Sequence, residues 1–302
     1  MQTLAVIIVS WNVRSLLDTC LASLRVALDQ ANVAANVWVV DNASSDGSAQ
    51  LVREKHPWAR LETPGENLGF VRANNLILKR MLEIESMPNY VWLLNPDTEV
   101  RPTAPARLLE AFAARPQAGL MGPKLLNPDG SLQQSAFRFP ALLQPLFDLG
   151  LMPPRLYDTR WNGRYRASDY AKSEPFQVDY PLGAAMMARG ATVAEVGLLD
   201  EGFTMYCEEI DWAWRMHKAG RTAWLVPQAE VIHHGGASTQ QARPVTTAYL
   251  WESRARLYRK YHGPLVRGIV GALVRQHFSR QTPASEAWAA AYRRIVDGWT
   301  TG

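Results

Sequence analysis

Three acidic residues stand close together in residues 206–212, which read Tyr-Cys-Glu-Glu-Ile-Asp-Trp. A helix is predicted to begin here and to end at Gly220, and the positive end of its dipole favours one or two acids in the first turn. The dipole does not account for three acids among apolar neighbours. A carboxylate in apolar surroundings has a raised pKa and can serve as a general base. Glu208, Glu209 and Asp211 are therefore candidates for proton transfer.

A second group of residues could hold a divalent cation. Asp97 follows Asn95 and Pro96, and because Pro96 fixes its own φ and restricts Asn95, the turn that carries this carboxylate is stiff. Such a carboxylate can bind a hard cation together with phosphate oxygens of a substrate, although Asp97 could instead cap the next turn. His233 and His234 follow a strand-like segment at 222–226, and an imidazole there could complete the metal site.

The elements that must position these groups alternate between strands and helices over the first 94 residues. Continuous apolar runs predict strands buried on both faces, and apolar residues at helical spacing predict amphipathic helices. Ser15, three residues before Asp18, resembles a capping box. The expected strands are residues 4–9, 37–40, 60–62 and 90–94, and the expected helices are residues 16–28, 51–56 and 70–82. This order predicts an α/β fold, with a mostly parallel central sheet and helices on both faces.

Polar residues follow three of these strands. The first strand is followed by Ser-Trp-Asn at 10–12, the second by Asp-Asn-Ala-Ser-Ser-Asp-Gly-Ser at 41–48 and the fourth by Asn-Pro-Asp at 95–97. Ligands of open α/β sheets bind beyond the carboxyl ends of the strands, so we expect these segments to converge on one site. Neither G-x-G-x-x-G nor G-x-x-x-x-G-K-[ST] occurs, so a nucleotide must be held by side chains and a metal ion.

Composition limits the class of protein. The 302 residues are 47% hydrophobic, enough for a substantial core, and Gly and Pro stand at ordinary levels, which excludes a disordered or collagen-like chain. The two cysteines, Cys20 and Cys207, provide no disulfide framework. The N-terminus lacks a basic signal-peptide region and no apolar run approaches the ~20 residues of a membrane span, so we expect a cytoplasmic protein.

The positive charge is concentrated at the C-terminus. Residues 251–302 contain nine Lys or Arg and three Asp or Glu, whereas the first 250 residues contain 23 and 25. This distribution argues against a nucleic-acid groove across the fold. Gly263 and Pro264 divide the segment 251–280 into two predicted helices. Either their basic faces lie on the inner face of an anionic membrane, or the helices pack on the rest of the fold and leave a basic face in solvent.

Residues 130–180 have no clear periodicity and contain nine aromatic residues among Pro and Arg, of which six are candidates for ligand contact. These six side chains could stack on the ring of a ligand or pack beneath a loop. The six are Phe137, Phe139, Phe147, Trp161, Tyr165 and Tyr170.

Taken in order, these segments resemble glycosyltransferase family 2, the inverting enzymes of GT-A fold, and are most similar to its rhamnosyltransferase branch. The resemblance covers roughly residues 4–240 and is carried by an ordered set of motifs. They are the segments at 6–12, 40–48, 67–75, 93–97 and 122–124, Gly-Ala-Ala at 183–185, Gly-Leu-Leu-Asp-Glu at 197–201, Glu-Glu-Ile-Asp at 208–211 with Arg215, and the segment 233–238.

The resemblance implies roles for individual residues. Asp41 corresponds to the acid that binds the nucleotide base, and the resemblance gives a metal contact to His233. Asp97 corresponds to the last residue of the metal-binding D-x-D motif, which here reads Asn-Pro-Asp. Glu209 corresponds to the catalytic base, although the family's Glu-Asp pair is Glu-Glu here, which leaves Glu208 and Asp211 as competitors. The other nucleotide-binding candidates are Ser10, Asn12, Asn42, Asn67, Asn75 and Asn95, and the acceptor candidates are Asp200 and Glu201.

The implied activity is single-displacement transfer of a sugar from a nucleotide-diphosphate donor, preferably dTDP-L-rhamnose, to a hydroxyl of a cell-surface glycan or glycolipid. Mg²⁺ or Mn²⁺ would assist. Residues 1–245 would form the catalytic domain, with a nucleotide-sugar half at about 1–100 and an acceptor half at about 101–245, and residues 246–302 a basic helical extension. The alternatives are a UDP-hexose donor, a non-catalytic nucleotide-sugar or carbohydrate-binding module and, more distantly, a nucleotidyltransferase.

Overall fold

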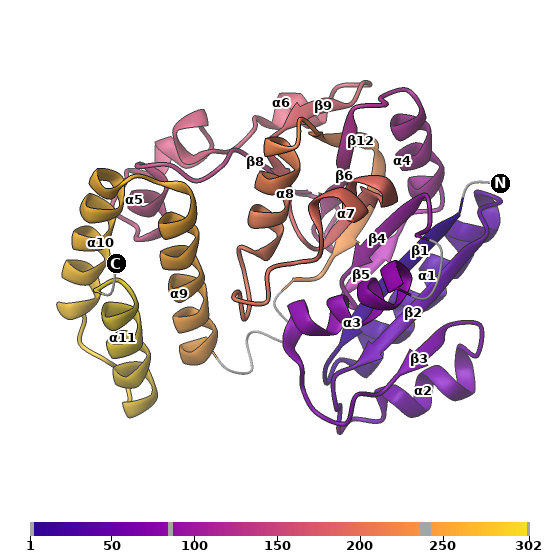
Figure 1. Ribbon diagram of the computed structural model, residues 1–302, viewed down its shortest axis with the longest axis horizontal. Coiled ribbons are helices and arrows are strands. Elements are labelled where there is room, and N and C mark those ends of the chain that lie inside the picture. Colours follow the sequence, from indigo (N-terminus) through magenta and orange to yellow (C-terminus); the bar gives the residue numbers. More distant parts are fainter. Residues whose placement is uncertain (1–2, 84–86, 236–242, 301–302) are drawn as a thin grey trace.

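The computed structural model describes residues 3–83, 87–235 and 243–300. Its first half alternates strands and helices as the apolar pattern predicts (Figure 1). The elements are β1 (Leu4–Ser10), α1 (Arg14–Gln30), β2 (Ala35–Asp41), α2 (Ser48–Lys55), β3 (Arg60–Glu62), α3 (Gly69–Glu83) and β4 (Tyr90–Leu94). Strand β1 pairs in parallel with β2 on one side and β4 on the other, so the carboxyl ends of these strands share one edge of the sheet.

The second half extends the sheet with strands of both directions. It adds β5 (Thr98–Val100), α4 (Ala104–Ala113), β6 (Ala118–Leu126), β11 (Ala185–Arg189) and β12 (Thr222–His233). The order of strands is β3-β2-β1-β4-β11-β6-β12-β5, in which β11 runs antiparallel to β4 and β6, and β5 runs antiparallel to β12. The strand predicted at 222–226 is longer than expected, because β12 continues through an irregularity between Val226 and Glu230 as far as His233.

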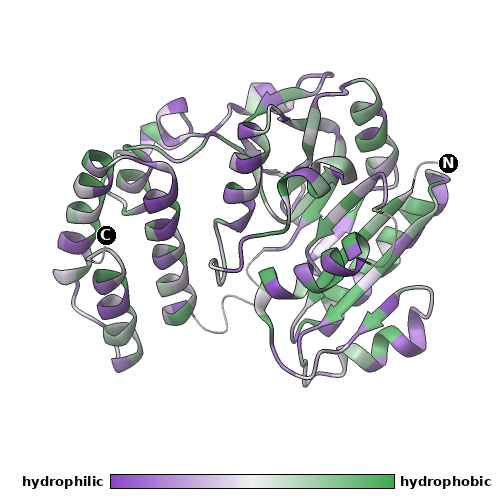
Figure 2. Ribbon diagram, viewed as in Figure 1, coloured by the Kyte–Doolittle hydropathy of each residue, from purple (hydrophilic) through white to green (hydrophobic). Residues whose placement is uncertain are grey.

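Helices cover both faces of the sheet. One core joins the strands to α1, α2 and α4, and the other joins them to α3, α7 (Gly190–Val196) and α8 (Glu208–Lys218). The central strands are buried along their whole length because both of their faces are covered, and Figure 2 shows them as mostly hydrophobic segments among helices of mixed character.

The start of α1 differs from the sequence prediction. Ser15 and Asp18 form no capping box, and Asp18 instead pairs with Lys55 and His56 of the α2 end. The first turn of α1 is satisfied by Asp46, whose Oδ2 accepts from the backbone N of Arg14 at 2.8 Å. Because Asp46 follows β2, this contact ties the loop after the second strand to the loop after the first.

Short elements fill the segment between β6 and β11. They are β7 (Leu132–Gln133), β8 (Ala136–Phe137), α5 (Gln144–Asp148), the 3₁₀ turns η1 (Pro154–Leu156) and η2 (Arg160–Asn162), α6 (Ala167–Tyr170), β9 (Phe176–Val178) and β10 (Tyr180–Pro181). Most aromatic side chains here serve packing: Phe139 stacks on Trp214 at 4.2 Å, and the hydroxyl of Tyr170 accepts from the backbone of Ala136. Trp161 is the exception, because half of its surface is exposed.

The C-terminal segment forms three helices, α9 (Arg243–Tyr261), α10 (Pro264–Ser279) and α11 (Glu286–Gly298), which stand together beside the sheet (Figure 1). The predicted break at Gly263 and Pro264 is confirmed, whereas the sequence pattern did not indicate α11. The three helices share a core of their own that includes Trp251, Val274 and Ile295. Across the described ranges, the structure contains no helix long and apolar enough to cross a bilayer.

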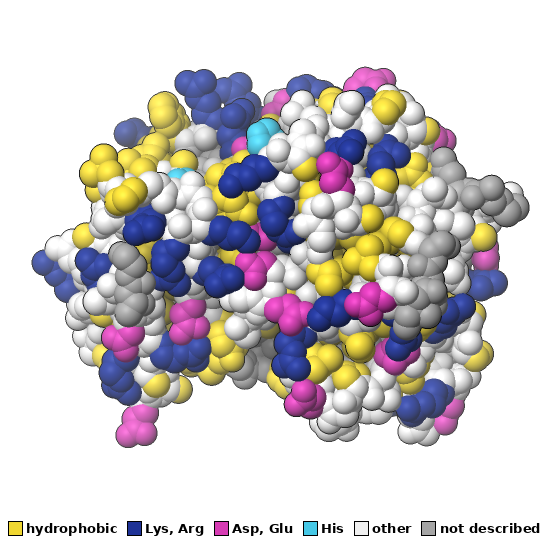
Figure 3. Space-filling model, viewed as in Figure 1, with side chains coloured by type: hydrophobic (Ala, Val, Ile, Leu, Met, Phe, Trp, Pro, Cys, Tyr) yellow, Lys and Arg dark blue, Asp and Glu magenta, His cyan; other side chains and the backbone are white. Residues whose placement is uncertain are grey.

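The basic side chains of α9 face the rest of the protein rather than forming a separate charged strip. Arg256 and Lys260 both pair with Asp200, and Arg254 pairs with Asp148 at 2.9 Å. Figure 3 accordingly shows acidic side chains among the basic ones where the C-terminal helices meet the body. The sequence left open whether these helices lie on a membrane or pack on the rest of the fold. The three cations of α9 named here belong to the packed arrangement, because they pair with acids of the body.

Candidate active site

The loops after β1 and β2 are locked together. The Oδ1 of Asn12 accepts from the backbone N of Ser45 at 2.8 Å, and the Oγ of Ser44 accepts from the backbone N of Asn12 at 3.0 Å. Asp41, at the end of β2, uses its Oδ2 to accept from the backbone N of Ser44, while its Oδ1 is buried without a partner. The hydroxyl of Ser10 is also buried without a partner. Unpartnered buried polar atoms are rare, and these two lie where a ligand is expected.

Other predicted nucleotide-binding residues hold the backbone around α3. Asn42 donates to the carbonyl of Gly69 and accepts from the backbone N of Leu68, and Asn67 accepts from the backbone N of Gly69. These contacts connect the end of β2 to the start of α3. Asn42 and Asn67 thus fix the backbone at the start of α3.

Asn75 does not reach the strand-end loops with a free side chain. It is 1% exposed, donates to the carbonyl of Leu199 and the carboxylate of Glu201, and accepts from the backbone N of Leu199. The position predicted to line the nucleotide pocket is therefore a buried tie between α3 and the loop before α8. Burial requires such pairing, because an unpaired amide would lose its hydrogen bonds to water.

The two predicted acceptor residues are likewise engaged within the protein. Burial by itself would raise the pKa of Asp200, but hydrogen bonds from Lys260 and Arg256 of α9 and from the backbone N of Gly202 outweigh it and lower the pKa to about 2. Glu201 pairs with Lys79 and Asn75 of α3. Both carboxylates thus join elements across the fold, and their role as acceptor-binding residues stays a prediction.

Asp97 and His233 lie side by side, although 136 positions separate them. Strands β5 and β12 are antiparallel with His233 opposite Thr98, and the backbone N of His234 donates to the carbonyl of Asp97 at 2.9 Å. The Nε2 of His233 lies 3.4 Å from the Oδ1 of Asp97, close enough for an ion pair when the imidazole is charged but without hydrogen-bond geometry.

The donor set at this position fits a divalent cation that keeps other ligands. The Oδ1 of Asp97 is buried without a hydrogen bond, and His233 is oriented by a 2.7 Å contact between its Nδ1 and the Oε1 of Gln133. Such support is typical of metal-binding histidines. Within residues 3–83, 87–235 and 243–300, no cluster of three or more His, Cys, Asp or Glu could hold a metal, so substrate phosphates and water would complete the coordination.

The three acids at the start of α8 have different surroundings. Asp211 is fully buried and bonded: its Oδ2 accepts from Arg215 at 2.8 Å, and its Oδ1 accepts from Tyr261 at 2.7 Å and pairs with Lys260 at 2.5 Å. Both of its oxygens are engaged within the protein. Among the three candidates for the base, the contacts therefore favour the glutamates over Asp211.

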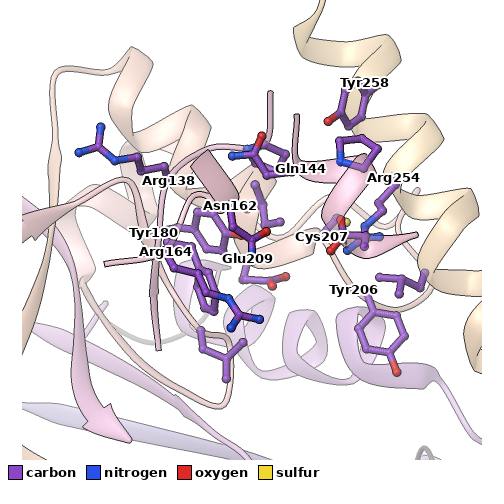
Figure 4. Close-up of a pocket in the computed structure, with 17 residues that line it drawn as sticks. Arg138, Gln144, Asn162, Arg164, Tyr180, Tyr206, Cys207, Glu209, Arg254 and Tyr258 are labelled. Atoms are coloured by element: carbon purple, nitrogen blue, oxygen red, sulfur yellow. Dashed lines mark ion pairs between the residues drawn. The ribbon is translucent and has the colours of Figure 1, made fainter. Parts of the chain in front are cut away.

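Glu209 faces a pocket of about 220 Å³ that lies between the body and α9 (Figure 4). Its Oε2 is buried without a hydrogen-bond partner, and burial raises its pKa to about 7. A base is most effective when its pKa lies near the working pH. Glu208 also has a pKa raised by burial and by Glu209, but it is 7% exposed and does not line the pocket.

Glu209 and Asp97 are brought to the same edge of the sheet. A Cβ placed on Gly183 would lie 3.4 Å from the Cβ of Glu209, so the glutamate packs against this backbone. The next residue, Ala184, accepts a hydrogen bond from the backbone N of Asn95 at 2.8 Å, and Asn95 is two positions from Asp97. The candidate base and the candidate metal ligand are therefore connected through one backbone contact and one hydrogen bond.

Backbone strain is concentrated around the site. Five non-glycine residues of the described chain have left-handed φ, and four of them lie in site loops. Asn12 (52°) and Ala43 (59°) follow β1 and β2, and Tyr206 (67°) and Cys207 (66°) directly precede α8. Such conformations cost about 1–3 kcal/mol each and persist where the surrounding structure enforces them. Tyr206 and Cys207 directly precede Glu208 and Glu209, so their backbone conformation orients the first turn of α8, which carries both glutamates.

Sequence reasoning missed most residues of the pocket, among them Arg138, Asn162, Arg164 and Tyr180. They lie in or directly after β8, η2 and β10, which are elements too short for periodicity to detect. The aromatic content at 130–180 was the one available signal, and Phe137 does line the pocket, stacked on Tyr180 at 5.5 Å.

Comparison with known proteins agrees with this geometry. Residues 5–165 match Glycosyl transferase family 2. The chain is 33% identical over 246 residues to N-acetylglucosaminyl-diphospho-decaprenol L-rhamnosyltransferase from two strains of Mycobacterium tuberculosis, covering 79% of this chain and 78% of the relative. It is 24% identical over 197 residues to a low-salt glycan biosynthesis hexosyltransferase of Haloferax volcanii, covering 65% of this chain and 58% of that protein.

Solved structures share the fold at low sequence identity. GalNAc-T7, crystallised with UDP, GalNAc and Mn²⁺, superimposes with a TM-score of 0.60 at 14% identity over 99% of this chain, which spans 54% of that chain. Residues 1–349 of TarS from S. aureus superimpose with a TM-score of 0.55 at 12% identity, covering 99% of this chain and 80% of that one. The chain therefore belongs to glycosyltransferase family 2 and is a glycosyltransferase of GT-A fold, with a rhamnosyltransferase among its relatives.

Proposed function

We propose that the enzyme transfers L-rhamnose from dTDP-L-rhamnose to a hydroxyl of a lipid-linked glycosyl diphosphate, with inversion at the anomeric carbon and with Glu209 as the base. The observation that carries the proposal is the position of Glu209, whose Oε2 has no hydrogen-bond partner and whose pKa is raised to about 7, in a pocket at the edge of the sheet that also carries Asp97 outside the pocket lining. The relative in M. tuberculosis, whose name specifies a diphosphate lipid acceptor and a rhamnosyl group, supports the choice of substrates.

The donor would bind over the carboxyl ends of β1, β2 and β4. Ser10 and Asp41 each offer a buried polar atom without a partner to the nucleotide, and Asn12 and Asn95 lie in the same loops. Asp97 and His233 would hold a divalent cation, and that cation would neutralise the diphosphate as it leaves. A GT-A neighbour crystallised with Mn²⁺ is consistent with this choice.

The chemistry is a single displacement. Glu209 accepts the proton of the acceptor hydroxyl while the oxygen forms a bond to the anomeric carbon. The bond from that carbon to the diphosphate oxygen breaks on the opposite face, and its electron pair leaves with the diphosphate. No covalent intermediate with the enzyme is needed, so one base suffices, and such a base contributes about 10²–10⁴ in rate.

The test begins with a thermal-shift panel of nucleotide sugars in the presence of Mg²⁺ or Mn²⁺, in which dTDP-L-rhamnose should stabilise the enzyme more than UDP-hexoses do. Initial rates with a short-chain N-acetylglucosaminyl diphosphate lipid then compare the wild type with Glu209→Gln. We expect the variant to lose about 10²–10⁴ of kcat and to retain donor binding. Near-wild-type turnover of Glu209→Gln would reject this base, and a product that retains configuration would reject inversion.

A lipid-linked acceptor would bring the enzyme to a membrane surface, and α10 carries a suitable contact. Leu265 and Ile269 are 76% and 48% exposed and, four positions apart, lie on one face of the helix. The surrounding residues 251–302 carry nine Lys or Arg against three Asp or Glu. Exposed apolar side chains with basic neighbours suit the surface of an anionic bilayer.

A further inference from the structure

The pocket that contains Glu209 also carries positive charge, because three arginines line it. Arg138 comes from the loop after β8, Arg164 from the chain after η2 and Arg254 from α9. The acids of the lining are Asp148 and Glu209, so the arginines outnumber them. Removal of a proton from one substrate hydroxyl does not by itself require this excess of positive charge.

Two of these cations are placed to act on a ligand beside Glu209. In Figure 4, Arg164 and Arg254 lie on different sides of Glu209, whereas Arg138 points away from it. The guanidinium of Arg164 contacts Asp158 at 3.2 Å, but Asp158 is 80% exposed, and such surface pairs contribute little.

Arg254 is held more firmly. Its side chain is 21% exposed, pairs with Asp148 at 2.9 Å and lies 4.7 Å from the ring of Trp251. One nitrogen of the guanidinium makes the Asp148 contact, and the group has five N–H donors in a planar fork that matches phosphate oxygens. Arg254 can therefore keep Asp148 and still donate to an anion in the pocket.

Two aromatic residues of the pocket lining offer a surface for a sugar ring. Phe137 and Tyr180 stack with ring centroids 5.5 Å apart, and both line the pocket with Glu209. Aromatic rings of this kind commonly cover the apolar face of a sugar. The pocket therefore combines an aromatic surface, a proton acceptor and two guanidinium groups.

We propose that this pocket is the acceptor subsite and that Arg164 and Arg254 bind a phosphoryl group attached to the acceptor sugar. The assignment rests on the proposed function and deepens it, because it names the anionic part of the acceptor as the feature that is recognised. It also gives α9 a role in specificity, since Arg254 belongs to that helix. In this proposal the acceptor binds at the arginines rather than at Asp200 and Glu201, which the sequence favoured for that role.

The experiment measures binding and turnover separately. The probes are a short-chain N-acetylglucosaminyl diphosphate lipid and the matching N-acetylglucosamine alkyl glycoside without phosphate, each titrated by ligand-detected NMR against the wild type, Arg164→Gln and Arg254→Lys. Arg254→Lys retains a charge for Asp148 but loses the planar fork. Arg160→Gln is the matched control, because Arg160 lies four positions from Arg164 and is not part of the pocket.

We expect Arg164→Gln to weaken binding of the diphosphate probe at least tenfold, Arg254→Lys to weaken it several-fold, and both to leave the alkyl glycoside unchanged. Equal losses for both probes would overturn the proposal, as would no loss for either. In kinetic assays the KM for the acceptor should rise while the KM for the donor stays constant. A rise confined to the donor KM would assign the arginines to the donor diphosphate and contradict the proposal.

Two further measurements distinguish the diphosphate of the acceptor from lipid head groups as the anion that the arginines bind. Inorganic pyrophosphate should compete with the diphosphate probe in the wild type and not in Arg164→Gln, and flotation with anionic liposomes should be equal for both proteins. A loss of flotation in Arg164→Gln without loss of probe binding would assign the arginine to lipid head groups instead. Because the binding arms need no turnover, they decide the subsite even if the proposed donor proves wrong.

Discussion

Tyr261 of α9 donates a hydrogen bond of 2.7 Å to the Oδ1 of Asp211, in the first turn of the helix that carries Glu209. The ring of Tyr261 also stacks on Trp214 of the same helix at 4.2 Å. The C-terminal helices thus contact the element that holds the candidate base through a buried polar bond and an aromatic pair. They are part of the support of the active site.

The first prediction concerns this contact. Tyr261→Phe keeps the ring stack and removes the hydroxyl, so Asp211 loses one of its buried donors. We expect a loss of about 1–3 kcal/mol in the free energy of unfolding, measured by urea denaturation, and a reduced kcat with an unchanged donor KM. Tyr292→Phe on α11 is the control and should change neither quantity. Unaltered stability of Tyr261→Phe would show that the bond contributes nothing.

The second prediction concerns the pH dependence of stability. Burial raises the pKa of Glu209 from 4.5 to about 7, so the folded protein retains a proton there that the unfolded chain releases. The resulting stabilisation is complete below pH 4.5 and is lost as the pH rises through 7. Gln carries no charge at any of these pH values. The Tm of Glu209→Gln should therefore rise relative to the wild type between pH 5 and pH 8.

A surface substitution provides the control for this measurement. Glu110→Gln removes an acid that is 62% exposed in its side chain, and its Tm relative to the wild type should stay nearly constant over the same range. If the difference for Glu209→Gln is also independent of pH, then Glu209 is ionised in the folded state across the range and the raised pKa is wrong.

The third prediction concerns the metal. Asp97→Asn and His233→Ala should each weaken metal-dependent binding of the donor nucleotide at least tenfold by calorimetry, because each removes one of two protein ligands. His234→Ala is a close control, since the Nε2 of His234 contacts Glu99 at 2.7 Å rather than Asp97. Removal of divalent ions with EDTA should abolish the difference between the wild type and Asp97→Asn. Equal weakening by His234→Ala would argue against the assignment.

The fourth prediction concerns the membrane. Replacing both Leu265 and Ile269 with Glu should reduce co-flotation with anionic liposomes without lowering the Tm, since both side chains are exposed. The mechanism is loss of apolar contact together with charge repulsion. The paired substitution of Val26 and Leu82, which are exposed on α1 and α3, should leave flotation unchanged. Flotation that does not depend on α10 would remove this surface from the proposal.

The sequence by itself determined the alternation of the first seven elements and the polar positions at the strand ends. Residues 4–9 and 90–94 are apolar without interruption, and this pattern requires strands covered on both faces wherever the chain places them. The carboxyl ends of parallel strands must meet at one edge, so Asp41 and Asp97 could be assigned to a common site before any coordinates. These inferences depend on local patterns and on general rules of sheet topology.

Only the tertiary structure decided which acids are free. Glu209 and Asp211 are two positions apart and both are carboxylic acids, but Tyr261 and Lys260, about 50 positions away, pair with Asp211, whereas the Oε2 of Glu209 has no hydrogen-bond partner. The protonation and availability of a carboxylate depend on burial and on donors supplied by distant segments. Spacing along the chain carries no record of those contacts. For the same reason the sequence does not show that Arg138, Arg164 and Arg254 line one pocket.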